Sequence, residues 1–170
     1  MSDQQSPGSL SATAGQSSIP GTDPAGLEPG SLSSSSVPAP ASVPDGFRCT
    51  ENSTADGVFY RHWSFDQPRG VVLLVHGLGE HCGRFQHVAE ALASAGFASL
   101  APDHLGHGRS PGHRCFIERF PRYFEALQVL RNEIDTLYPQ LPCFIVGHSM
   151  GGLITSNYLL EHQHHFAGAA

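Results

Sequence analysis

The pentapeptide Gly147-His148-Ser149-Met150-Gly151 is the strongest chemical signal in the sequence. A serine on a tight strand-to-helix turn exposes its hydroxyl, and serines held in this way act as nucleophiles in acyl transfer. Gly147 and Gly151 fit the pattern because such a turn crowds the backbone on both sides of the serine. The same pattern also arises by chance in a glycine- and serine-rich chain, where the serine merely caps a helix. The surroundings of Ser149 must therefore decide between the two readings.

A second motif, His76-Gly77-Leu78-Gly79, directly follows an apolar segment. Acyl transfer requires backbone N–H groups aimed at the oxygen that becomes negative in the transition state. One such N–H is expected from Met150, the residue after the serine, and the other from this loop, with Leu78 as the best candidate. His76 and Gly77 would shape the loop, and a helix that starts at Ser149 would add its positive dipole end. The alternative is an ordinary turn between a strand and a helix.

The segments around both motifs alternate between buried strands and amphipathic helices. Runs without polar alternation are typical of strands covered on both faces, and they occur at Val71–Val75, Phe97–Ala101 and Cys143–Val146. Apolar residues at three- and four-residue spacing predict helices near residues 85–95, 120–138 and 151–161. An early strand is expected over residues 57–65, and another begins at 166–170. The order predicts an α/β fold with a doubly wound, mostly parallel sheet and helices on both faces.

The first 46 residues differ sharply in composition from the remainder. They consist mainly of Ser, Pro, Gly and Ala, and the first aromatic residue is Phe47. Such a segment buries too little apolar area to offset its ordering entropy, so residues 1–46 are expected to be a disordered leader. The leader lacks the basic and apolar regions of a secretory signal, and the absence of arginine before Arg48 argues against a transit peptide. A cytoplasmic protein is expected.

Charge and composition exclude several functional classes. A net charge of -6 provides no basic surface for nucleic acid. The longest apolar runs have about six residues, far fewer than the ~20 that cross a bilayer. The four cysteines are widely spaced, which favours free thiols in a reducing compartment. The cluster of His162, His164 and His165 is expected to be a solvated helix end, so neither a metal nor a cofactor is implied.

Four motifs, taken in order, resemble the monoacylglycerol lipase and lysophospholipase-like group of α/β-hydrolases, which is also labelled by its similarity to serine aminopeptidases (S33). They are His76–His81, Gly83–Phe85, Asp103–Ser110 and Gly147–Gly152. The resemblance covers residues 47–170 and implies a serine ester hydrolase that forms an acyl-serine intermediate on a lipid ester without a cofactor. By motif, Ser149 is the nucleophile, Leu78 and Met150 are the oxyanion donors, and Asp103–Ser110 is a structural turn.

The resemblance also implies parts that these residues do not supply. A cap, an Asp on a later strand and a His near the carboxyl end complete the family pattern, so residues 47–170 are expected to be the amino-terminal half of a domain truncated after the nucleophile helix. His162, His164 and His165 lie about 20 to 24 Å along a helix from Ser149, too far to replace the missing base. The nearest substitutes are His104, His107 and His113, with Asp103.

Three functional readings therefore stay open. The first is a working serine hydrolase that acts on a small lipid ester, with contact to a membrane surface left open. The second is a catalytically inactive fragment that acts by binding a lipid or a partner through an exposed sheet edge. The third is a peptidase or another hydrolase of the same fold, because fold alone does not determine substrate.

Overall fold

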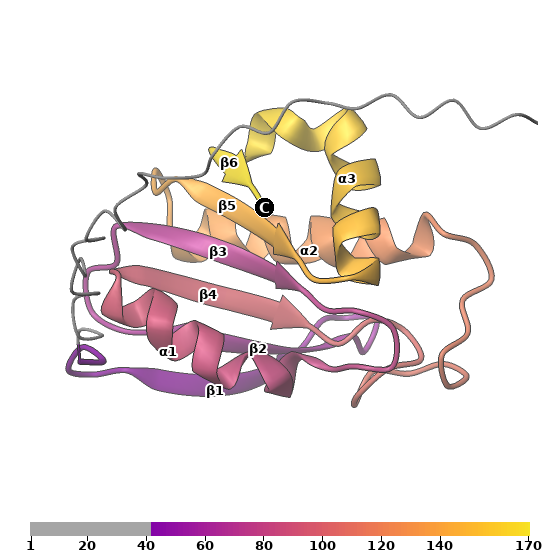
Figure 1. The fold of residues 1–170 in the computed structure, drawn as a ribbon, viewed down its shortest axis with the longest axis horizontal. Helices are drawn as coiled ribbons and strands as arrows, with labels where there is room; N and C mark the ends of the chain where they lie inside the picture. Colours follow the sequence, from indigo (N-terminus) through magenta and orange to yellow (C-terminus); the bar gives the residue numbers. More distant parts are fainter. Residues whose placement is uncertain (1–41) are drawn as a thin grey trace, which may run out of the picture. The chain divides into compact units, whose positions relative to one another are not determined.

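The computed structural model describes residues 42–170, which form a six-stranded sheet flanked by helices (Figure 1). The strands are β1 (Arg48–Ser53), β2 (Phe59–Ser64), β3 (Gly70–Val75), β4 (Phe97–Pro102), β5 (Cys143–Gly147) and β6 (Gly168–Ala169). The helices are α1 (Gln86–Ser94), α2 (Arg122–Leu137) and α3 (Met150–His162), with short 3-10 turns at Cys82–Phe85 and Gln163–His165. The leader expected over residues 1–46 lies almost entirely outside the described residues.

The sheet has the strand order β1-β2-β4-β3-β5-β6. Strand β3 lies at the centre and pairs in parallel with β4 and β5, and β5 pairs in parallel with β6. Strands β1 and β2 form an antiparallel hairpin that joins the sheet through β4. The expected mostly parallel sheet is confirmed, and the carboxyl ends of β3 and β5 meet at one edge because their register aligns Val75 with Gly147.

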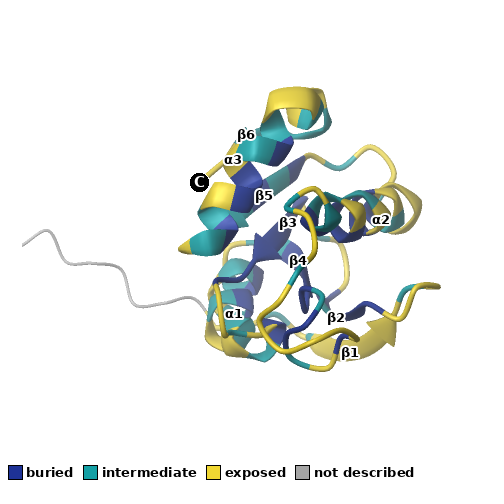
Figure 2. Ribbon diagram, turned by 90° about the vertical axis from the view of Figure 1, so that its right-hand side faces the viewer, coloured by how far each residue is buried: buried dark blue, intermediate teal, exposed yellow. Residues whose placement is uncertain are grey.

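Strand β3 is buried on both faces, as its unbroken apolar sequence predicts. Val72 and Leu74 pack in one cluster with Ala89 of α1, whereas Leu73 and Val75 pack in another with residues of α2 and α3. Helix α1 therefore covers one face of the sheet and the other two helices cover the opposite face (Figure 1). Figure 2 shows the central strands buried between exposed helix surfaces. The predicted two-faced packing is confirmed.

Strand β1 is the main element that the sequence analysis missed. Its residues, Arg48 to Ser53, are all exposed and carry no apolar alternation. It pairs only with β2, so it is an edge strand whose side chains face solvent. Glu51 bridges Arg61 of β2 and Arg109 of the loop after β4, at 2.9 and 2.6 Å. A polar edge strand of this kind lacks the apolar pattern by which strands are recognised in sequence.

The four cysteines are free thiols in the structure. Cys49 and Cys115 are exposed, whereas Cys82 and Cys143 are buried. Burial raises the pKa of the Cys143 thiol to about 11, so this group is protonated at neutral pH. Cys143 opens the expected strand and packs there as a small apolar residue.

Candidate active site

Ser149 occupies a strained turn between β5 and α3. Its backbone has φ 55° and ψ −120°, a conformation that costs energy for any residue other than glycine. The residue is exposed, and among the described residues no side chain hydrogen-bonds to its hydroxyl. Strain of this kind concentrates at functional sites, where it holds a group in a position that relaxed backbone does not reach. The predicted strand-to-helix turn with an accessible serine is therefore present.

The two glycines of the motif are required by close packing of the backbone. A Cβ on Gly147 would lie 2.4 Å from the carbonyl oxygen of Gly151, and a Cβ on Gly151 would lie 2.1 Å from that of Val75. The turn is also fixed to the central strand by a 2.9 Å hydrogen bond from the His148 N–H to the Val75 carbonyl. Both glycines thus allow the turn to press against the end of β3.

The loop after β3 runs against this turn. A Cβ on Gly77 would lie 3.2 Å from the Cβ of Ser149, so the two motifs, more than seventy residues apart in sequence, are in contact. Leu78 is 59% exposed beside Gly79, which has φ +71°. Within residues 42–170, neither the Leu78 N–H nor the Met150 N–H donates a hydrogen bond. Both predicted oxyanion donors are therefore free backbone N–H groups.

Three buried histidines pack together beside the loop that follows β3. The rings of His76, His104 and His107 lie with centroids 4.1 to 6.1 Å apart. His76 donates from Nδ1 to the Gly77 carbonyl at 2.7 Å and accepts the His104 N–H at Nε2 at 2.9 Å, which fixes its neutral tautomer. His104 in turn donates from Nε2 to the His76 carbonyl at 3.0 Å. All three lie in loops and are nevertheless buried.

Burial of His76 and His104 makes the stability of the protein depend on pH. Burial lowers the pKa of His76 from about 6.5 to about 4, and the pKa of His104 lies well below its ordinary value for the same reason. The unfolded chain therefore binds more protons than the folded chain between pH 6.5 and 4. Stability is complete above pH 6.5 and is lost as the pH falls towards 4.

We expect His76 alone to lower the free energy of unfolding by about 1.3 kcal/mol between pH 7.5 and 5.5. Urea denaturation at the two pH values measures this loss, to which the partly buried His62 adds because its pKa is also about 4. The His76→Gln variant should show a shallower pH dependence, whereas replacement of the exposed His87 by Asn should leave it unchanged. Equal slopes for His76→Gln and the parent would contradict the assignment.

The loop that starts at Asp103 is held by the carboxylate of that residue. Asp103 is 1% exposed and accepts the N–H of Cys82 at 2.6 Å and the N–H of Arg109 at 2.7 Å. Its carbonyl accepts the hydroxyl of Ser110 at 2.7 Å, and that hydroxyl accepts the Phe59 N–H. Asp103 and His104 are thus engaged in holding the loop, and His113 lies in the exposed part of the connection. The structure supports the structural turn and not an improvised catalytic dyad.

The histidines at the end of α3 contact other aromatic rings. His162 stacks on Tyr158 with centroids 4.3 Å apart, and His164 lies against His165 at 4.0 Å. In the part of the chain that the structure describes, no group of three His, Cys, Asp or Glu side chains is placed to hold a metal ion. The histidines at this helix end therefore make aromatic contacts, and among the described residues they form no cluster of metal ligands.

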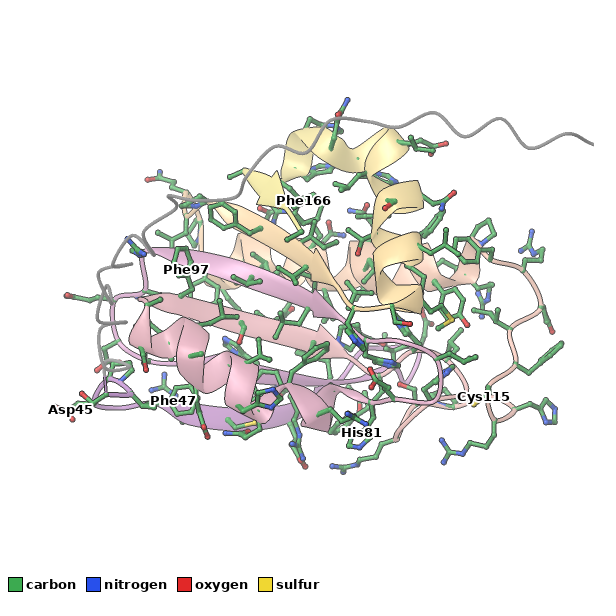
Figure 3. The ribbon with its side chains drawn as sticks, in the orientation of Figure 1. Asp45, Phe47, His81, Phe97, Cys115 and Phe166 are labelled. Carbon is green, nitrogen blue, oxygen red and sulfur yellow. The ribbon has the colours of Figure 1, made fainter. Side chains whose placement is uncertain are left out.

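A pocket of about 420 Å³ is lined by residues outside the serine turn. Its lining includes Val58, Leu105, Phe116 and Ala126. Leu105 and Phe116 belong to the long connection between β4 and α2, in which Cys115 also lies (Figure 3). Ser149, Leu78 and Met150 do not line it. The candidate site is thus defined by the backbone geometry of the serine turn and not by this pocket.

One residue that the sequence analysis did not single out links the two motifs. The Glu80 carboxylate accepts the Gly77 N–H at 3.3 Å and lies 3.1 Å from Nδ1 of His148. A glutamate that follows a glycine-rich loop resembles a solvated charge in sequence, and its partner lies 68 residues away. The signal available was its position two residues after an expected oxyanion donor.

The sheet, its two helical layers and the serine turn at the carboxyl edge define an α/β-hydrolase fold. A carboxyl esterase from Bacillus coagulans has a similar structure, with a TM-score of 0.62 and 31% identity over 73% of this chain and 43% of that one. A monoglyceride lipase from Saccharomyces cerevisiae has a TM-score of 0.58 and 26% identity over 72% of this chain and 42% of that one. Among the described residues, no helix has the length and apolarity needed to cross a bilayer.

The chain belongs to the family described as serine aminopeptidase, S33, whose pattern matches residues 66–170. Several of its relatives are nevertheless named as monoacylglycerol lipases. A monoglyceride lipase of Rattus norvegicus is 38% identical over 67% of this chain and 39% of its own length. A monoacylglycerol lipase of Mycolicibacterium smegmatis is 42% identical over 59% of this chain and 36% of its own length. This chain spans about two fifths of the length of these relatives, and the expected resemblance is confirmed.

Proposed function

We propose that this chain is part of a serine ester hydrolase that acts through an acyl-serine intermediate on Ser149. The main support is the exposed Ser149, whose backbone has φ 55°. The turn that carries it packs against the loop of Leu78, and the N–H groups of Leu78 and Met150 are both free within the described residues. In the proposed reaction the hydroxyl attacks the ester carbonyl, its proton passes to a general base, and the alcohol leaves with a proton. Water then releases the acid and regenerates the serine.

The proposed substrate is a small glycerolipid ester. The names of the relatives support a monoacylglycerol or a similar lipid. Exposed Leu78 and Leu153 flank the turn and offer apolar surface to an acyl chain. Because such esters partition into membranes, the proposal includes peripheral contact with a membrane surface in the whole protein. The peptidase named in the family description is the less favoured reading, since the relatives' names give it no support.

A second candidate function is binding without turnover. The hydrogen bonds of residues 42–170 place no histidine ring on the Ser149 hydroxyl. His76 and His104 are engaged within the loop, and the ring of His148 lies against Glu80. A site with a nucleophile and oxyanion donors but without a positioned base retains only weak catalysis. A chain limited to these residues would then hold a lipid ester more readily than it would cleave it.

Labelling by a fluorophosphonate probe tests the proposal. We expect the chain to react at Ser149 and the Ser149→Ala variant to react at least on the order of 10³-fold more slowly. Ser156→Ala is a matched control because this serine is also exposed on α3, where its hydroxyl bonds the Gly152 carbonyl. Labelling that survives in Ser149→Ala would contradict the assignment. Absence of labelling in the parent chain, together with retained binding of a monoacylglycerol, would favour the second candidate.

A further inference from the structure

We propose that Glu80 is a positioning residue that clamps the loop carrying Leu78 to the turn carrying Ser149. One oxygen of its carboxylate, Oε2, joins both sides of the site: it accepts the Gly77 N–H at 3.3 Å and lies 3.1 Å from Nδ1 of His148. Gly77 immediately precedes Leu78, and His148 immediately precedes Ser149. A single side chain thus bonds to the neighbours of both the expected oxyanion donor and the expected nucleophile.

The carboxylate is held in place for this task. Its second oxygen, Oε1, lies 3.3 Å from Nε of Arg84, one turn further along the chain. The Glu80 N–H donates to the Gly77 carbonyl at 3.4 Å, so its backbone closes the same loop. The side chain is only 18% exposed, although it is charged and lies in a surface loop. These contacts leave the carboxylate little freedom to turn away from the site.

The surroundings of Glu80 stabilise its negative charge. Partial burial raises the pKa of the carboxyl group, but the Gly77 N–H, His148 and Arg84 together outweigh this effect and hold the pKa below its usual value. Glu80 is therefore ionised at neutral pH, and its bonds to Gly77 and His148 are charge-assisted. Without them the turn would still be fixed to the end of β3 by the hydrogen bond from the His148 N–H to the Val75 carbonyl, but the described residues offer no other side-chain hydrogen bond between the loop and the turn.

The clamp matters because catalysis depends on the distance between the loop that carries Leu78 and the turn that carries Ser149. The Leu78 and Met150 N–H groups can stabilise one oxyanion only if the loop and the turn keep their relative placement. A displacement of about 1 Å at such a site can reduce the rate about 10²-fold. The catalytic part of this inference rests on the proposed function, whereas the clamp itself can be observed without any reaction.

Glu80→Ala and Glu80→Gln separate the clamp from a general structural role, and Glu118→Ala is the matched control because Glu118 is an exposed loop glutamate. The amide oxygen of glutamine can still accept from the Gly77 N–H and the His148 ring, but it carries no charge, and its NH₂ group would then face Arg84. In a ¹⁵N-labelled chain at neutral pH, we expect the Gly77 amide of Glu80→Ala to exchange about fivefold faster. Amides of β4 should be unchanged, and Glu80→Gln should show an intermediate rate.

The rate of fluorophosphonate modification gives the second readout. We expect Glu80→Ala to react about tenfold more slowly than the parent, through the maximal rate of modification and not through binding of the probe, with partial rescue in Glu80→Gln. Unchanged exchange at Gly77, or an unchanged rate of modification in Glu80→Ala, would overturn the clamp. If the parent chain does not react at all, the proposed function fails for this chain, and exchange at Gly77 alone decides the clamp.

Discussion

Substitution of Gly151 by alanine should destabilise the protein by about 3 kcal/mol or more, a large share of the 5 to 15 kcal/mol typical of a domain. The added Cβ would lie 2.1 Å from the Val75 carbonyl oxygen and 2.8 Å from that of His76. Both atoms belong to the backbone at the end of β3, so neither can move aside cheaply. Urea denaturation followed by circular dichroism measures the loss, and labelling at Ser149 should fall with it.

The adjacent glycine provides the matched control. Gly152 also lies in the first turn of α3, but a Cβ there would be 3.4 Å from the Gly147 carbonyl oxygen, which is an ordinary van der Waals distance. Because alanine is a better helix former than glycine, Gly152→Ala should be neutral or stabilising by up to about 1 kcal/mol. Equal destabilisation by the two variants would show that the turn does not press against β3 as described.

The second large effect is expected at Asp103. Asp103→Ala should cost about 4 kcal/mol, because it removes the hydrogen bonds of the carboxylate to two backbone N–H groups and leaves the buried N–H of Cys82 without a partner. Asp103→Asn should cost about half as much, since its amide oxygen can accept only one of the two N–H groups while its NH₂ group opposes the other. Both values are accessible from urea denaturation at constant pH.

The control for this prediction is an exposed aspartate. The Asp66 side chain is 86% exposed and lies 3.9 Å from Arg48, so Asp66→Asn should change stability by less than about 0.5 kcal/mol. The Asp103 variants should also loosen the β4–α2 connection, which limited proteolysis between Arg109 and Arg119 would detect. A stable Asp103→Ala variant with an intact connection would refute the structural role of the carboxylate.

The sequence contained enough information for most of the fold. The segments around β3, β4 and β5 are short apolar runs, and burial on both faces leaves this pattern in any sequence that forms such strands. Helices α1 and α2 follow from apolar spacing in the same way. Strand β1 could not be found by these rules, because its side chains face solvent and its position depends on backbone pairing with β2.

The candidate site was predictable to the extent that it depends on backbone. The turn at Ser149 and the loop at Gly77 each require glycine at fixed positions, and this requirement is visible in the sequence. Contacts made by side chains across the site were not. Nothing local to Glu80 indicates that it reaches His148, and nothing local to His104 indicates that it packs against His76. The first contact exists because β3 is adjacent to β5 in the sheet, and the second because β3 is adjacent to β4.

The central position of β3 also affects how the chain folds as it leaves the ribosome. One edge of β3 pairs with β4, but its other edge pairs with β5, and the partner of Val71 is Cys143, 72 residues later in the chain. At 5 to 20 residues per second, synthesis of that interval takes about 4 to 14 s. During this time the most apolar strand of the protein keeps an unpaired edge, so the nascent chain depends on chaperones or on rapid packing of α1 to avoid misassembly.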